Sequence, residues 1–128
     1  PPSDSANIEQ LWRAGKIGPG TGSLLVYRDR LYSITAPGVL FAADLKTGDT
    51  KWQLRLTGPF SGSPVAAGGH LFVFNEKGEG QCVKLGETEG ELVSTNDLNG
   101  ETFLCTPAVA DGAIYIRSDQ TLWKIAAK

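Results

Sequence analysis

Short runs of hydrophobic residues, separated by Gly, Pro, Asn and Asp, follow one another along the chain, and their layout repeats. The first unit starts at Ser23, the second at Ser63 and the third at Thr106, so the starts are 40 and then 43 residues apart. In each unit one run leads through a two-residue turn into a second run, as 23–27 leads into 30–34. Both faces of these runs are apolar, which predicts strands covered on both sides.

A period of about 40–45 residues with several short strands per unit is typical of the blades of a β-propeller. We therefore predict an all-β fold with three propeller blades of four antiparallel strands each. The predicted blades are blade one at 23–56, blade two at 63–97 and blade three at 106–126. A simple β-sandwich is the alternative, but it would show cleaner alternation of apolar and polar residues and would not explain the period.

The predicted fourth strands of the blades indicate how a ring of blades would close. Blade one has its predicted fourth strand at 50–56, and blade two has a weaker one at 91–96, where few apolar residues occur. Blade three has no fourth strand, whereas an outer strand at 8–14 resembles the fourth strand of blade one but has no blade before it. The chain is therefore predicted to be a half-propeller in which one blade is a composite of the N-terminal strand and the three C-terminal strands.

The composite blade predicts an assembly interface in which the N-terminal strand of one copy pairs with the third strand of blade three in another. The residues expected there are Leu11, Trp12, Leu122, Trp123 and Ile125. Propellers typically have about 4–8 blades, so three blades are too few to close a ring. We expect the chain to bind itself, most simply as a homodimer with six blades. The alternative is that the chain is a fragment of a longer propeller.

Residues 42–52 carry the most specific motif, which reads A-x-D-x-x-T-G-x-x-x-W. Its fixed positions are Ala42, Asp44, Thr47, Gly48 and Trp52. Thr47 and Gly48 are expected to form a turn whose backbone N–H groups donate to Asp44. Trp52 should bury its ring against the neighbouring blade, with its N–H on a carbonyl oxygen. The pattern resembles the tryptophan-docking motif of the pyrroloquinoline-quinone-like propeller repeat family.

Blade two keeps only a remnant of this motif, with Lys84 at the Asp position and Val93 near the Trp position. The resemblance extends from about residue 9 to the end of the chain. It implies bacterial proteins of the periplasm or another extracytoplasmic location, among which are cofactor-free scaffolds as well as quinone-dependent dehydrogenases.

The dehydrogenases of this family hold the quinone with adjacent cysteines, a tryptophan floor, and acidic and Asn residues that bind calcium. In this chain Cys82 and Cys105 are 23 residues apart, and Trp123 lies within a strand pattern. The carboxylates do not follow a calcium-binding D-x-D-x-D spacing. We therefore expect no enzymatic activity, no catalytic residue, no cofactor and no metal, and we expect a self-assembling scaffold or binding module. A quinone-dependent oxidoreductase is the alternative from a different class.

Charge and composition exclude several other partners. The net charge is −2 and the basic residues are scattered, which argues against nucleic acid binding. No apolar stretch is long enough for a membrane-inserted helix, and no signal-peptide pattern opens the chain. The two cysteines are expected to be buried free thiols, with a disulfide as the alternative.

Overall fold

The structure, a computed structural model, describes residues 8–126, and its regular elements in that range are eleven strands. Blade one contains β1 (Leu25–Tyr27), β2 (Arg30–Ile34), β3 (Val39–Asp44) and β4 (Thr50–Arg55). Blade two contains β5 (Val65–Ala67), β6 (His70–Phe74), β7 (Glu79–Leu85) and β8 (Gly90–Asp97). Blade three contains β9 (Ala108–Ala110), β10 (Ala113–Arg117) and β11 (Leu122–Ala126).

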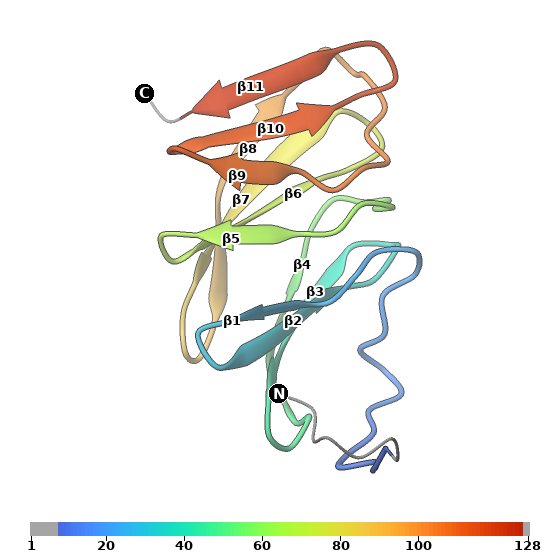
Figure 1. The fold of residues 1–128 in the computed structure, drawn as a ribbon, viewed down its shortest axis with the longest axis vertical. Coiled ribbons are helices and arrows are strands. Elements are labelled where there is room, and N and C mark those ends of the chain that lie inside the picture. The colour runs from blue at the N-terminus through green and yellow to red at the C-terminus, as the bar shows by residue number, and fades with distance from the viewer. Residues whose placement is uncertain (1–7, 127–128) are drawn as a thin grey trace.

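Each blade is an antiparallel meander in which strands that are neighbours in sequence are neighbours in the sheet. The three sheets are stacked one on another, and their short first strands β1, β5 and β9 lie side by side along one edge of the stack (Figure 1). This arrangement confirms the predicted all-β fold of propeller blades, with four, four and three strands.

Hydrophobic side chains pack between the sheets, which is why the strands are apolar on both faces. The core between blades one and two includes Tyr32, Leu40, Trp52, Leu71 and Val83. A second core lies between blades two and three, where the ring of Phe74 is 5.7 Å from that of Phe103.

The outer face of blade one is covered by the segment that precedes it. Ile17 is buried there against Leu31 and Ala43, and Trp12 packs against the same cluster. The outer strand predicted at 8–14 is not formed in the single chain. A strand needs a neighbouring backbone for its hydrogen bonds, and the neighbour predicted for this segment belongs to another copy.

The fourth strand of blade two has few buried side chains, as predicted, but it is longer than the predicted 91–96. β8 is eight residues long, the longest strand in the described chain, although residues 91–97 are all exposed. It pairs with β7 along its whole length, with a register shift at Cys82 and Val83. Backbone pairing rather than burial of apolar side chains therefore holds this strand in place.

Candidate functional site

The turn between β3 and β4 is organised by the carboxylate of Asp44. Its Oδ1 atom accepts hydrogen bonds from the backbone N–H of Lys46 at 2.8 Å and of Thr47 at 3.0 Å. These two backbone bonds hold the pKa of Asp44 below its usual value. The Thr47 hydroxyl oxygen accepts the backbone N–H of Asp49, and Gly48 adopts a positive φ of 78°. Ala42, the first motif position, is completely buried on β3.

This turn aims β4 so that Trp52 docks onto blade two. The Trp52 indole N–H donates to the carbonyl oxygen of Gly86 at 2.9 Å, and the ring lies against Gly90 at the start of β8. On its other side the ring is 6.0 Å from that of Tyr32. The side chain is buried, its N–H is hydrogen-bonded and its ring is packed on both sides. This geometry is typical of a structural residue.

Trp12 makes the same contacts one blade earlier. Its indole N–H donates to the carbonyl oxygen of Leu45 at 3.1 Å, and its ring lies against Gly48. Gly48 therefore has two roles, since it forms the turn by its positive φ and also leaves room for the ring from the preceding blade. The sequence motif identified only the first role, although the 40-residue spacing of Trp12 and Trp52 was the signal for the second.

The predicted interface residues are not brought together in the single chain, since residues 8–14 lie against blade one and β11 belongs to blade three. Leu11 is 81% exposed and Leu122 is 74% exposed. Trp123 and Ile125 are half-buried and pack into the core between blades two and three.

The Trp123 indole N–H donates to Glu101 at 3.3 Å. Glu101 also accepts the hydroxyl of Ser118, and this bond is the main reason why the pKa of Glu101 lies below its usual value. The side chain of Trp123 thus already has partners within its own chain.

A series of hydrogen bonds to hydroxyl groups links the segments that lead into the first strands of the three blades. The backbone N–H of Ser23 donates to the hydroxyl oxygen of Ser63 at 2.6 Å, and the backbone N–H of Ser63 donates to that of Thr106 at 3.0 Å. Each blade is thus tied to the next by the residue at the start of its repeat. The sequence marked these three positions as repeat starts but did not reveal this contact.

The quinone and calcium implied by the family resemblance do not fit the side chains of the described chain. Cys82 and Cys105 are free thiols, on β7 and in the connection between blades two and three. Cys105 is exposed, so its predicted burial is wrong, because it lies in a surface connection rather than in a strand. Residues 8–126 contain no group of three His, Cys, Asp or Glu side chains that could hold a metal ion.

None of the described residues forms a helix of the length and apolarity that a membrane span requires.

Comparison with known proteins decides the family. A sequence model described as outer membrane protein assembly factor BamB matches residues 4–91 and, in a second overlapping match, residues 56–128. The chain belongs to this family of pyrroloquinoline-quinone-like propeller repeats. Among curated proteins, no significant match is found.

Solved structures show the same fold in longer chains. BamB from Moraxella catarrhalis superposes with a TM-score of 0.66 at 23% identity, over 80% of this chain and 32% of that one. A quinohemoprotein alcohol dehydrogenase, ADHIIG from Pseudomonas putida HK5, gives 0.69 at 15% identity, over 83% of this chain and 18% of that one. A europium-containing methanol dehydrogenase gives a TM-score of 0.62 at 19% identity, over 73% of this chain and 19% of that one. The chain thus spans about a third of the BamB chain and less than a fifth of each dehydrogenase.

Proposed function

We propose that this BamB-family chain is a non-enzymatic propeller module that closes into a six-bladed ring with a second copy of itself, and that the ring is a scaffold or binding surface. The docking of Trp12 carries the proposal. Trp12 lies on Gly48 and Leu45 of blade one in the way that Trp52 lies on Gly90 and Gly86 of blade two. It is therefore docked as the outer strand of a preceding blade would dock it. β11 of blade three offers the unpaired edge that such an outer strand needs.

The hydroxyl series supports a blade on each side of the described three. Ser23 donates its N–H to Ser63, and by the same repeat its own hydroxyl would accept from a preceding blade. The Thr106 hydroxyl accepts from Ser63, and by the same repeat the Thr106 N–H would donate to a following blade. In the proposed dimer the N–H of Thr106 donates to the hydroxyl of Ser23 of the second copy, so that the series runs round the ring. Two copies give six blades, within the usual range of about 4–8.

The hydrogen bonds of two buried polar side chains support a structural role, since their partners include backbone groups of nearby turns. Buried Asn75 accepts from the N–H groups of Lys77 and Glu79 and donates to the carbonyl oxygen of Thr57. Ser118 accepts from the N–H groups of two residues in the β10–β11 turn. Side chains engaged in this way hold turns in shape and are not available as acids, bases or nucleophiles.

A second candidate is that the three blades are a segment of a longer propeller, as in the BamB and dehydrogenase structures. The share of those chains that this chain covers favours it. In that case the same open edges are completed by further blades of the same polypeptide.

The absolute mass in solution distinguishes these candidates. We expect twice the 13.6 kDa chain mass at micromolar concentration. The variant Leu122→Lys should fold normally, because Leu122 is exposed in the single chain, and should be monomeric, because the ring buries this side chain against the next blade. Leu104→Lys is the control, since Leu104 is equally apolar and 56% exposed but lies in a connection outside the strands. A monomeric wild type would contradict closure with a second copy and favour the longer propeller.

The enzymatic alternative needs a separate test. The chain is mixed with pyrroloquinoline quinone and calcium, excess is removed, and the absorption spectrum and dye-linked alcohol oxidation are recorded. We expect no retained quinone, and stoichiometric retention with turnover would overturn the non-enzymatic proposal.

A further inference from the structure

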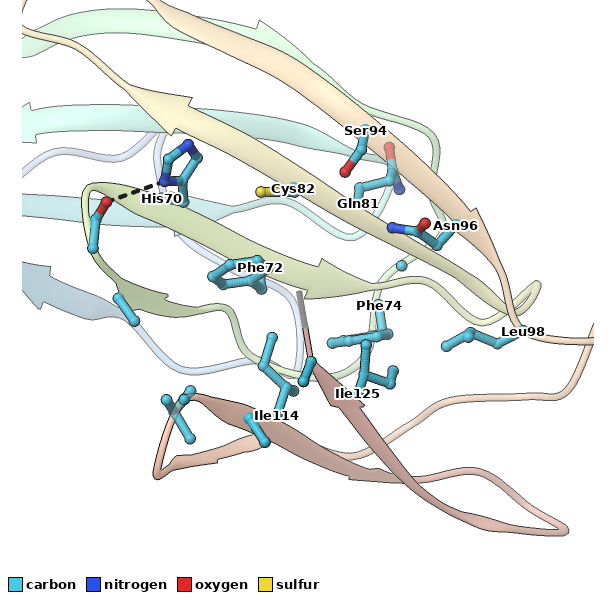
Figure 2. A pocket seen from close by; sticks show the side chains of 17 residues that line it. His70, Phe72, Phe74, Gln81, Cys82, Ser94, Asn96, Leu98, Ile114 and Ile125 are labelled. Atoms are coloured by element: carbon cyan, nitrogen blue, oxygen red, sulfur yellow. Dashed lines mark hydrogen bonds between the residues drawn. The ribbon is translucent and has the colours of Figure 1, made fainter. Parts of the chain in front are cut away.

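A cavity of about 670 Å³ lies between blades two and three. Figure 2 shows Phe72 and Phe74 projecting from β6 toward Ile114 and Ile125 of blade three, while Ser94 and other residues of β7 and β8 form the remaining wall. A cavity of this volume is in the range of roughly 300–1,000 Å³ that small-molecule sites occupy.

The cavity occupies the place that Trp52 fills between blades one and two. In blade one Trp52 pairs with Ala42, and in blade two Ser94 pairs with Cys82. Ala42 and Cys82 are equivalent, because each pairs with the third residue of the preceding strand. The register therefore puts Ser94, rather than neighbouring Val93, at the tryptophan position, since each outer strand has its register shift at this point.

Two more positions on the same face lose bulk in blade two. Tyr27, at the end of β1, is replaced by Ala67 at the end of β5, and both pair with the first residue of the next strand. Leu54 of β4 is replaced by Asn96 of β8, and each pairs with the residue two positions before Ala42 or Cys82. Together with Ser94 in place of Trp52, these changes remove two aromatic rings and an aliphatic side chain from one interface.

The rest of the interface does not compensate for this loss. Phe74 packs against Phe103 and beside Gly80, where a β-carbon would lie 2.8 Å from its ring, and does not reach the tryptophan position. What is left is an apolar space lined by Phe72, Ile114 and Ile125, with Ser94 and Asn96 at one side. A mostly apolar lining with a few polar groups is typical of small-molecule sites.

We infer that this cavity binds a small planar aromatic molecule of the size of an indole ring, with a hydrogen-bonding group at one edge. An indole fills the equivalent place one blade earlier, where Trp52 packs near Tyr32 and uses its N–H on a carbonyl oxygen. In the cavity the aromatic face meets Phe72, and the polar edge meets the Ser94 hydroxyl and Asn96 amide. All of these lining residues belong to one chain.

None of the three tryptophans of this chain is the occupant. The chain has three tryptophans. Trp12 is docked on Gly48, Trp52 on Gly90, and Trp123 is hydrogen-bonded to Glu101. We therefore assign the cavity to a free molecule, and the test below distinguishes it from a side chain of an adjoining blade.

Binding is tested with indole as the probe and with the wild-type chain in the assembly that it forms in solution. NMR titration should show saturable shifts confined to the methyl groups of Ile114 and Ile125 and the amides of Ser94 and Asn96. Indole should also slow maleimide alkylation of Cys82, which lines the cavity, and leave the rate at exposed Cys105 unchanged. Burial raises the pKa of the Cys82 thiol, so its reaction is followed over longer times by peptide mass spectrometry.

Ser94→Trp should fill the cavity, abolish saturable binding and raise the melting temperature. Thr95→Trp is the matched control, because the next residue of β8 points to the opposite face and should leave binding intact. If Ser94→Trp does not fold, Ala67→Tyr replaces it in the test. This variant fills the cavity from β5 and should also abolish saturable binding. A wild type without saturable, local shifts, or a folded Ser94→Trp that still binds indole, would overturn the proposal. In the first case a side chain of an adjoining blade fills the space.

Discussion

Trp52 and Gly90 lie in direct contact across the boundary between blades one and two. A β-carbon placed on Gly90 would stand 2.5 Å from the indole ring of Trp52, which is closer than two carbon atoms can approach. The glycine of one blade is thus matched to the tryptophan of the blade before it, and stacking of the blades depends on both.

Truncation of Trp52 to Ala should destabilise the chain strongly. The side chain is buried and its N–H is bonded to Gly86. Loss of a buried ring of this size costs about 3–5 kcal/mol. Chemical denaturation should show this decrease, and Trp52→Phe should show a smaller one because the packing is partly kept. Normal stability combined with loss of binding to a small molecule would contradict the structural role of Trp52.

Gly90→Ala should be costly only while Trp52 is present. In the wild type the new methyl group collides with the indole ring, and overpacking of this kind costs about 1–3 kcal/mol. In the Trp52→Ala background the same change meets an empty space and should be nearly neutral. A double-mutant cycle measures the difference, and additive effects of the two changes would mean that the two residues do not interact.

The sequence predicted Trp52 and its turn because the residues that form them are close together in one motif. Residues 8–14 were predicted as a strand from their likeness to β4. A strand forms only when a second backbone segment pairs with it, and the single chain offers this segment no such partner. The length of β8 was underestimated because backbone hydrogen bonds with β7 hold this strand in place, and the pattern of apolar and polar side chains does not reveal such bonds. The cavity at Ser94 could not be found because the register shift beside Cys82 decides which residue faces blade three.

Ser33→Val should stabilise the protein. Ser33 is 1% exposed, and its hydroxyl has no hydrogen-bond partner in the described chain. The equivalent fourth residues of β6 and β10 are Val73 and Ile116, so an aliphatic side chain suits this position. Because an unsatisfied buried polar group costs about 1–3 kcal/mol, valine should increase the free energy of unfolding by about 1 kcal/mol.

The matched control for this change is Ser118→Val. Ser118 is also buried, but its hydroxyl accepts from the N–H groups of Gln120 and Thr121. The same substitution should therefore destabilise here, since it leaves the turn without its acceptor. The free energy of unfolding of both variants is measured by urea denaturation. If it changes in the same direction in both, hydrogen bonding of the hydroxyl does not decide the outcome.

The acid dependence of stability should reveal the hydrogen bonds of Asp44. Its pKa in the folded chain lies below the ordinary value of 3.8, first because of the backbone N–H of Lys46 and then because of that of Thr47. A lowered pKa in the folded state means that the ionised carboxylate stabilises the fold above pH 3.8, and that this contribution is lost as the pH falls through the folded-state pKa. Asp44→Asn keeps an acceptor oxygen but cannot ionise. The wild type should therefore be more stable than Asp44→Asn at pH 7, and the difference should shrink in urea denaturation below pH 3.8. A difference that stays constant down to pH 2 would show that the charge of Asp44 does not stabilise this turn.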